Sequence, residues 1–162
     1  MMKKIIFIGL ILLLSLGGFV GRAQERSVTE LRKLVAPGNK VAVVFKDFSG
    51  DIDEKDAFIQ AYLRERSEWV VVDKVDKADF VLYVEGDAKW TDKSPTSKTY
   101  FMTPAIRTPK GKELWKGESV YDWANLSNGF RAVRGVSWLL VRSVILGLEK
   151  EIGEAPKVVY SV

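Results

Sequence analysis

The first residues of the chain decide where the rest of it folds. Met1 to Lys4 include two lysines, and residues 5–21 carry no charged side chain. Gly21-Arg22-Ala23 then places small residues at the two positions that a signal peptidase reads. We therefore expect a secretory signal peptide over residues 1–23, cleaved between Ala23 and Gln24. The alternative is an uncleaved anchor helix, although the run falls just short of the ~20 apolar residues that span a bilayer.

The expected mature chain, residues 24–162, has the length of one domain with its own core. The sequence contains no Cys, so neither a lipid-bearing cysteine nor a disulfide is expected. The predicted location is therefore the periplasm or the extracellular medium, in a protein that its apolar core alone must hold together.

The chain also contains no His. Together with the missing Cys, this excludes Ser-His and Cys-His nucleophile pairs, CxxC redox sites and zinc sites of ordinary composition. We expect no cofactor and no metal. Loss of Lys3, Lys4 and Arg22 with the signal peptide lowers the basic count from 25 to 22, against 21 acidic residues. A net charge of +1 gives no support for nucleic-acid binding.

Apolar periodicity predicts one α/β (α+β) domain over residues 40–153, with a mixed sheet of about five strands and helices packed on it. The expected order is β-α-β-β-β-β-α, with strands over 40–46, 69–72, 80–90, 99–107 and 113–123 and helices over 53–66 and 130–152. Residues 93–98 are expected to be a loop. A capping box at Ser27 predicts a short helix over 28–35 within an N-terminal arm, 24–39. Residues 154–162 are expected to form a C-terminal tail or short strand.

The last predicted helix has an apolar stripe that includes Val136, Leu140 and Val144, with Arg134 and Arg142 on the opposite side. This pattern is typical of a helix that packs on a core. The apolar stretch is too short for a bilayer and contains Arg142, so we expect no transmembrane span in the mature chain.

Several short features occur together over residues 40–152. They are the strand 40–46, the Ala78-Asp79 pair before a strand, the turn at Gly111 before Trp115, and the long final helix. In this combination the chain resembles the small α/β domain shared by the TolB amino-terminal domain and the CsgG-type envelope lipoproteins. The resemblance implies a mixed sheet with helices on one side, in a cell-envelope protein that contacts other proteins and has no enzymatic activity. The lipid-bearing Cys, the pore-forming strands and the propeller of those proteins are not found in this sequence, so their specific roles do not carry over.

Aromatic residues provide the main candidate for a binding site. Alternation along the predicted strand 113–123 places Trp115, Tyr121 and Trp123 on one face. That face is either part of the core or, if it is exposed, a surface suited to a protein, peptide or glycan partner.

Acidic residues suggest two other kinds of site. The turn that contains Asp47, Asp51 and Asp53 is rich in carboxylates, but their spacing does not match a calcium loop. A glycan-active enzyme needs only two carboxylates at the right separation, and the strand residues that could supply them are Glu85, Asp87, Glu113 and Glu118.

These observations favour a non-catalytic protein-interaction or envelope-assembly module, whose partner is another envelope protein. The carboxylate-based enzyme is the leading alternative. A small-ligand carrier is the third, although no pocket is indicated by the sequence.

Overall fold

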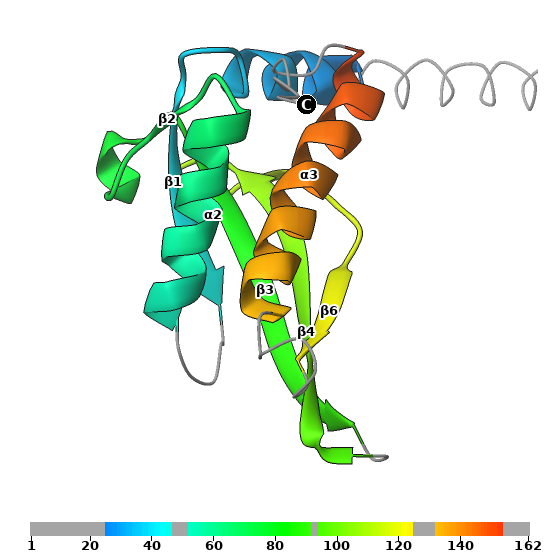
Figure 1. Cartoon of the computed structure of the whole chain (residues 1–162). Helices are drawn as coiled ribbons and strands as arrows, with labels where there is room; N and C mark the ends of the chain where they lie inside the picture. The colour runs from blue at the N-terminus through cyan, green and yellow to red at the C-terminus, as the bar shows by residue number, and fades with distance from the viewer. Residues whose placement is uncertain (1–24, 47–51, 92–93, 125–131, 154–162) are drawn as a thin grey trace, which may run out of the picture.

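A computed structural model describes residues 25–46, 52–91, 94–124 and 132–153 (Figure 1). Residues 25–34 form an N-terminal helix. The elements that follow are β1 (Lys40–Lys46), α2 (Ile52–Arg66), β2 (Val70–Val71), the 3₁₀ turn η1 (Val75–Lys77), β3 (Phe80–Thr91), β4 (Ser94–Arg107), β5 (Glu113–Lys116), β6 (Val120–Ala124) and α3 (Ala132–Ile152).

The strands form one mixed sheet in the order β2-β1-β3-β4-β5, and β6 also pairs with β4. β1 runs parallel to β2 and β3, whereas β4 is antiparallel to β3, β5 and β6. The predicted α/β class and mixed sheet are therefore confirmed. The sheet has six strands because the strand predicted over 113–123 is two separate strands, β5 and β6.

The helices pack on one face of this sheet, as Figure 1 shows for α2 and α3. α2 lies nearer β1, and α3 lies over β4 and β6. The core between the layers includes Ile59 and Leu63 of α2 and Leu82 of β3, all fully buried. The predicted α3 stripe is confirmed, since Val136, Leu140 and Val144 on that helix are buried while Arg134 and Arg142 are exposed.

The β3–β4 hairpin extends beyond the rest of the sheet (Figure 1). β1 pairs with β3 only as far as Lys46 and Glu85, but β3 and β4 remain paired out to Thr91 and Ser94. The loop predicted over 93–98 is therefore wrong from Ser94 onward, where β4 begins. Pro95 is tolerated there because it lies at the start of the strand, beside a register irregularity.

Side-chain hydrogen bonds attach the N-terminal helix and the turn after it to the domain, among them one from Lys112 Nζ to the Glu30 carboxylate at 2.6 Å. The indole Nε1 of Trp69 donates to the Val35 carbonyl at 2.8 Å, and Nη2 of Arg32 donates to the Ile152 carbonyl at 2.8 Å. Residues 25 and 26 are already helical, so the predicted start at a Ser27 cap is wrong. The structure thus confirms a helix in the arm but begins it earlier than the capping pattern indicated.

Candidate binding surface

The aromatic-rich stretch 113–124 changes face part of the way along. Ile106 of β4 lies opposite Trp115 on β5, whereas Phe101 lies opposite Tyr121 on β6. If the β4–β5 register continued without a break, Phe101 would lie opposite Val120. The segment that joins β5 to β6 therefore contains one residue more than a continuous strand would. A shift of one residue turns every following side chain to the other face of a sheet. The prediction that Trp115, Tyr121 and Trp123 share a face is therefore wrong.

Pro104 of β4 accounts for the break. The Gly117 N–H donates to the Pro104 carbonyl at 2.9 Å, but Pro104 has no N–H with which to return the bond. The regular ladder therefore ends at this pair. On the far side of the break, the hydroxyls of Thr103 and Ser119 form a 2.6 Å hydrogen bond.

Trp115 points toward the helices and has a structural role. Its ring is half-buried and packs against the core. The ring passes so close to α3 that a Cβ atom added to Gly147 would lie 2.5 Å from its Cζ2 atom. Trp115 therefore sets the distance between β5 and α3, and the structure removes it from the predicted aromatic surface.

Tyr121 and Trp123 lie on the opposite, helix-free face of the sheet. Their side chains are 59% and 53% exposed, respectively. Phe101 of β4 lies beside them, with its ring centroid 6.0 Å from that of Tyr121. The ammonium group of Lys89 approaches the Phe101 ring at 5.7 Å. We call Phe101, Tyr121 and Trp123 the aromatic face.

Ion pairs surround the carboxylates that were candidates for glycan chemistry. Glu85 lies between Lys46 and Lys116, each at 3.6 Å. The positive charge of Lys116, and to a smaller extent that of Lys46, holds the pKa of the Glu85 carboxyl below its ordinary value. A general acid that works near neutral pH needs the opposite shift.

The other candidate carboxylates are arranged in a similar way. Glu113 accepts two hydrogen bonds from Arg107, at 3.2 Å from Nε and 2.8 Å from Nη2. Asp87 lies 3.6 Å from Lys89. Glu118 is exposed in the link between β5 and β6. The geometry of these residues does not favour a pair of carboxyl groups acting as acid and nucleophile.

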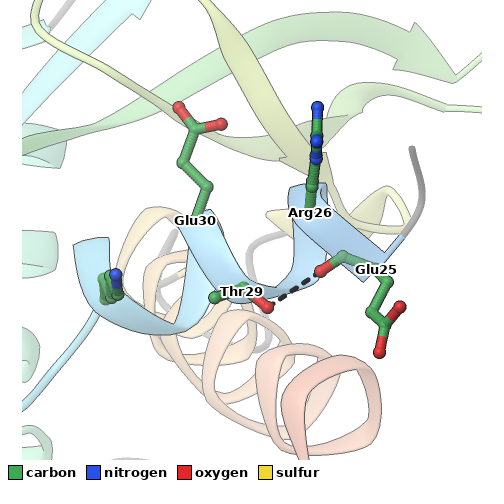
Figure 2. Close-up of a pocket in the computed structure, with 5 residues that line it drawn as sticks. Glu25, Arg26, Thr29 and Glu30 are labelled. Atoms are coloured by element: carbon green, nitrogen blue, oxygen red, sulfur yellow. Dashed lines mark hydrogen bonds between the residues drawn. The ribbon is translucent and has the colours of Figure 1, made fainter. Parts of the chain in front are cut away.

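Two shallow hollows lie elsewhere on the described part of the molecule. The first, of about 460 Å³, is lined by Glu25, Arg26, Thr29, Glu30 and Lys33. Figure 2 shows that the labelled residues come from the N-terminal helix, where the Thr29 hydroxyl donates to the Glu25 carbonyl at 2.9 Å. No second element contributes to this set, so its polar groups do not converge on a ligand position.

The second hollow, of about 450 Å³, lies between β5 and α3. It is lined by Trp115, Lys116, Gly117, Glu118, Ser143, Leu146, Gly147, Lys150 and Glu151. Both strand and helix contribute to this hollow, and its floor is partly apolar.

The described residues support neither a metal site nor a membrane-spanning helix. Among them, no group of three or more acidic side chains is placed to hold a metal ion. Asp47 and Asp51 of the acidic turn lie outside the described residues, as do the predicted cleavage site at Ala23 and Gln24 and the tail 154–162. Within the same described ranges, the helices are too short or too polar to cross a membrane.

The protein is thus a mixed sheet with helices packed on one face, and the other face carries exposed aromatic residues. No protein-family model matches the chain. A search of curated proteins also finds no match.

Solved structures with a similar course of the chain include several bacterial proteins. The hypothetical protein CT253 from Chlamydia trachomatis is 12% identical, with a TM-score of 0.46, over 71% of this chain and 98% of that one. PelC from Paraburkholderia phytofirmans, described as a dodecamer, is 16% identical, with a TM-score of 0.48, over 67% and 89%. Lipoprotein GNA1162 from Neisseria meningitidis is 16% identical, with a TM-score of 0.41, over 69% and 99%. At this level of similarity, no activity or partner transfers to this chain, and the specific resemblance to TolB and CsgG-type domains stays a prediction.

Proposed function

We propose that this chain is a non-catalytic binding module of the bacterial cell envelope, which contacts another envelope protein through the aromatic face. The observation that carries the proposal is the exposure of Tyr121 and Trp123 on the side of the sheet that the helices leave open. Burial of such rings on a partner gives a large contact area with little loss of side-chain entropy, and aromatic residues are enriched at protein interfaces.

The surroundings of the aromatic face favour a protein as the partner. Lys89 and Asp87 form an ion pair beside Phe101, and Thr103 and Ser119 supply hydroxyl groups on the same side of the sheet. An apolar centre with a polar rim of both charge signs is the usual composition of a protein interface. The ion pairs at Glu85 and Glu113 provide no comparable support for the glycan-active enzyme.

The envelope location follows from the predicted signal peptide. If residues 1–23 are removed, the intact mass of the protein from its native host corresponds to a chain that begins at Gln24. Retention of Met1 to Ala23 in a membrane fraction would contradict the secreted form.

Site-specific photo-crosslinking tests the proposed surface. A photo-reactive residue at Tyr121 is expected to give one discrete crosslinked protein in cells, whereas the same group at Arg64, exposed on α2 of the opposite layer, is expected to give none. Binding of that protein to the purified chain should then weaken at least tenfold in Tyr121→Ala and remain unchanged in Arg64→Ala. Equal crosslinking from the two positions, or unchanged affinity of Tyr121→Ala, would reject the aromatic face as the binding surface.

A further inference from the structure

The β3–β4 hairpin has two outer edges where it extends beyond β1. β3 continues to Thr91 after its last pair with β1 at Glu85, and β6 pairs with β4 on the opposite side of the hairpin. Among the described strands, none pairs with the outer side of β6 or with the outer side of β3 beyond Glu85. Open strand edges of this kind can add a further strand, and proteins commonly protect them.

The register shows which way the peptide groups of β6 point. The Pro104 carbonyl accepts a hydrogen bond from Gly117, on the side of β4 that faces β5 and β6. Because peptide groups alternate between the two sides of a strand, those of Tyr100 point the same way, toward its partner Asp122. The N–H of the next residue, Trp123, therefore points to the outer edge. It donates to Oδ1 of the Asp122 side chain at 2.8 Å.

The outer edge of β3 has the same arrangement. Phe101 directly follows Tyr100, so its peptide groups point toward β3, where it pairs with Asp87. The N–H of Ala88 therefore points away from β4, at a position beyond the last pair of β3 with β1. This N–H donates to Oδ1 of the Asp87 side chain at 2.8 Å. An aspartate thus covers one outward N–H on each side of the hairpin.

These two contacts oppose the addition of a strand. An incoming strand would have to place a carbonyl oxygen where the aspartate Oδ1 already lies, so two oxygens would compete for one N–H. Covering the carboxylate with another chain would also remove part of its hydration, which costs free energy. Charged side chains on edge strands are a common protection against edge-to-edge pairing for this reason.

We propose that Asp87 and Asp122 keep the hairpin from pairing with a further strand, in particular with the hairpin of a second copy of this chain. Each carboxylate occupies the outward N–H of the residue that follows it. A partner is then left to bind the exposed side chains of Tyr121 and Trp123 without extending the sheet. The protection of the edges does not depend on the proposed function, since it would operate whether or not the aromatic face binds a partner.

Sedimentation of the full chain, purified as the cell produces it, tests the proposal. The first variant is Asp87→Ala, because this side chain is 60% exposed on the hairpin and its loss should leave the fold intact. We expect its self-association constant to exceed that of the wild type about tenfold or more, because the uncovered N–H groups of two copies can bond to the opposing strand. The matched control, Asp76→Ala, removes the same charge from the exposed turn η1 and should leave self-association unchanged.

Further variants separate the hydrogen bond from the charge. Asp87→Asn keeps an oxygen that can accept from Ala88 but carries no charge, so it should associate less than Asp87→Ala. Amide hydrogen exchange gives a second readout: the N–H of Ala88 should exchange faster in Asp87→Ala, and that of Trp123 faster in Asp122→Ala.

Three results would overturn the proposal. The first is unchanged self-association, or unchanged amide exchange, in Asp87→Ala and in its double variant with Asp122→Ala. The second is equal association of Asp87→Ala and Asp87→Asn, and the third is equal association of Asp76→Ala. None of these measurements bears on Tyr121, so failure here is distinguishable from failure of the proposed function.

Discussion

Two glycines of α3 contact the sheet layer in different ways. A Cβ atom at Gly147 would lie 2.5 Å from the ring of Trp115, which is wedged between α3 and Gly117. A Cβ atom at Gly135 would instead meet the carboxylate of Asp122, the far end of a side chain that can rotate. The same substitution should therefore have opposite consequences at the two positions.

Gly147→Ala is expected to destabilise the domain by about 1–3 kcal/mol, because neither the helix backbone nor the indole ring can move without disturbing the core. Gly135→Ala is the matched control. It should be neutral or stabilising by up to about 1 kcal/mol, since alanine is the better helix former. Urea melts of both variants provide the measurement, and equal destabilisation would contradict the proposed position of Trp115.

Glu85 provides a second prediction at the scale of single residues. The folded-state pKa of its carboxyl lies below the ordinary value of 4.5, mainly because of Lys116. The stabilisation from this shift is present above the unfolded-state pKa and is lost as the pH falls through the folded-state pKa. An NMR titration of the Glu85 side chain should show the lowered pKa, and Lys116→Ala should raise it toward 4.5. An unchanged pKa in that variant would show that Lys116 is not the cause.

Individual aromatic residues could be identified in the sequence, but the directions of their side chains could not. Alternation is reliable only within one uninterrupted strand, and the interruption depends on Pro104, which belongs to a different strand from Trp115 and Tyr121. The pairing of Pro104 with Gly117 is a long-range contact that periodicity does not contain. The packing of Trp115 against the helix layer depends in turn on its close approach to Gly147.

Among the elements, α3 supports the largest share of the core. Leu140 is fully buried near the middle of the helix. Leu140→Ala should therefore cost about 2–5 kcal/mol, from lost apolar burial and the cavity left behind. Glu149→Ala, on the exposed side of the same helix, is the control and should change stability by less than about 0.5 kcal/mol. Comparable losses in chemical denaturation would mean that the two sides of α3 are wrongly assigned.

Most elements could be predicted from the sequence because their apolar periods are local properties. The α3 stripe and the β1 strand are examples. The ends of elements were less predictable: Pro95 and its polar neighbours have the composition of a loop, yet pairing with β3 holds β4 in an extended form from Ser94. Long-range pairing overrides local turn preference in this hairpin.

At the scale of the whole molecule, the one-sided packing of the helices is the feature with functional meaning. It gives the sheet a buried face, which stabilises the domain, and an open face, on which Tyr121 and Trp123 are exposed. The sequence resemblance implied this arrangement of layers. The arrangement leaves the aromatic face accessible to a partner.

Hydroxyl-radical footprinting of Tyr121, in the isolated protein and in intact cells, tests whether a partner covers the aromatic face. Tyr121 should be modified rapidly in the isolated chain and strongly protected in cells. Tyr62, half-buried on the helix layer with its hydroxyl bonded to Arg134 at 3.1 Å, should be modified equally in both. Equal modification of Tyr121 in the isolated chain and in cells would contradict the claim that the aromatic face binds another protein.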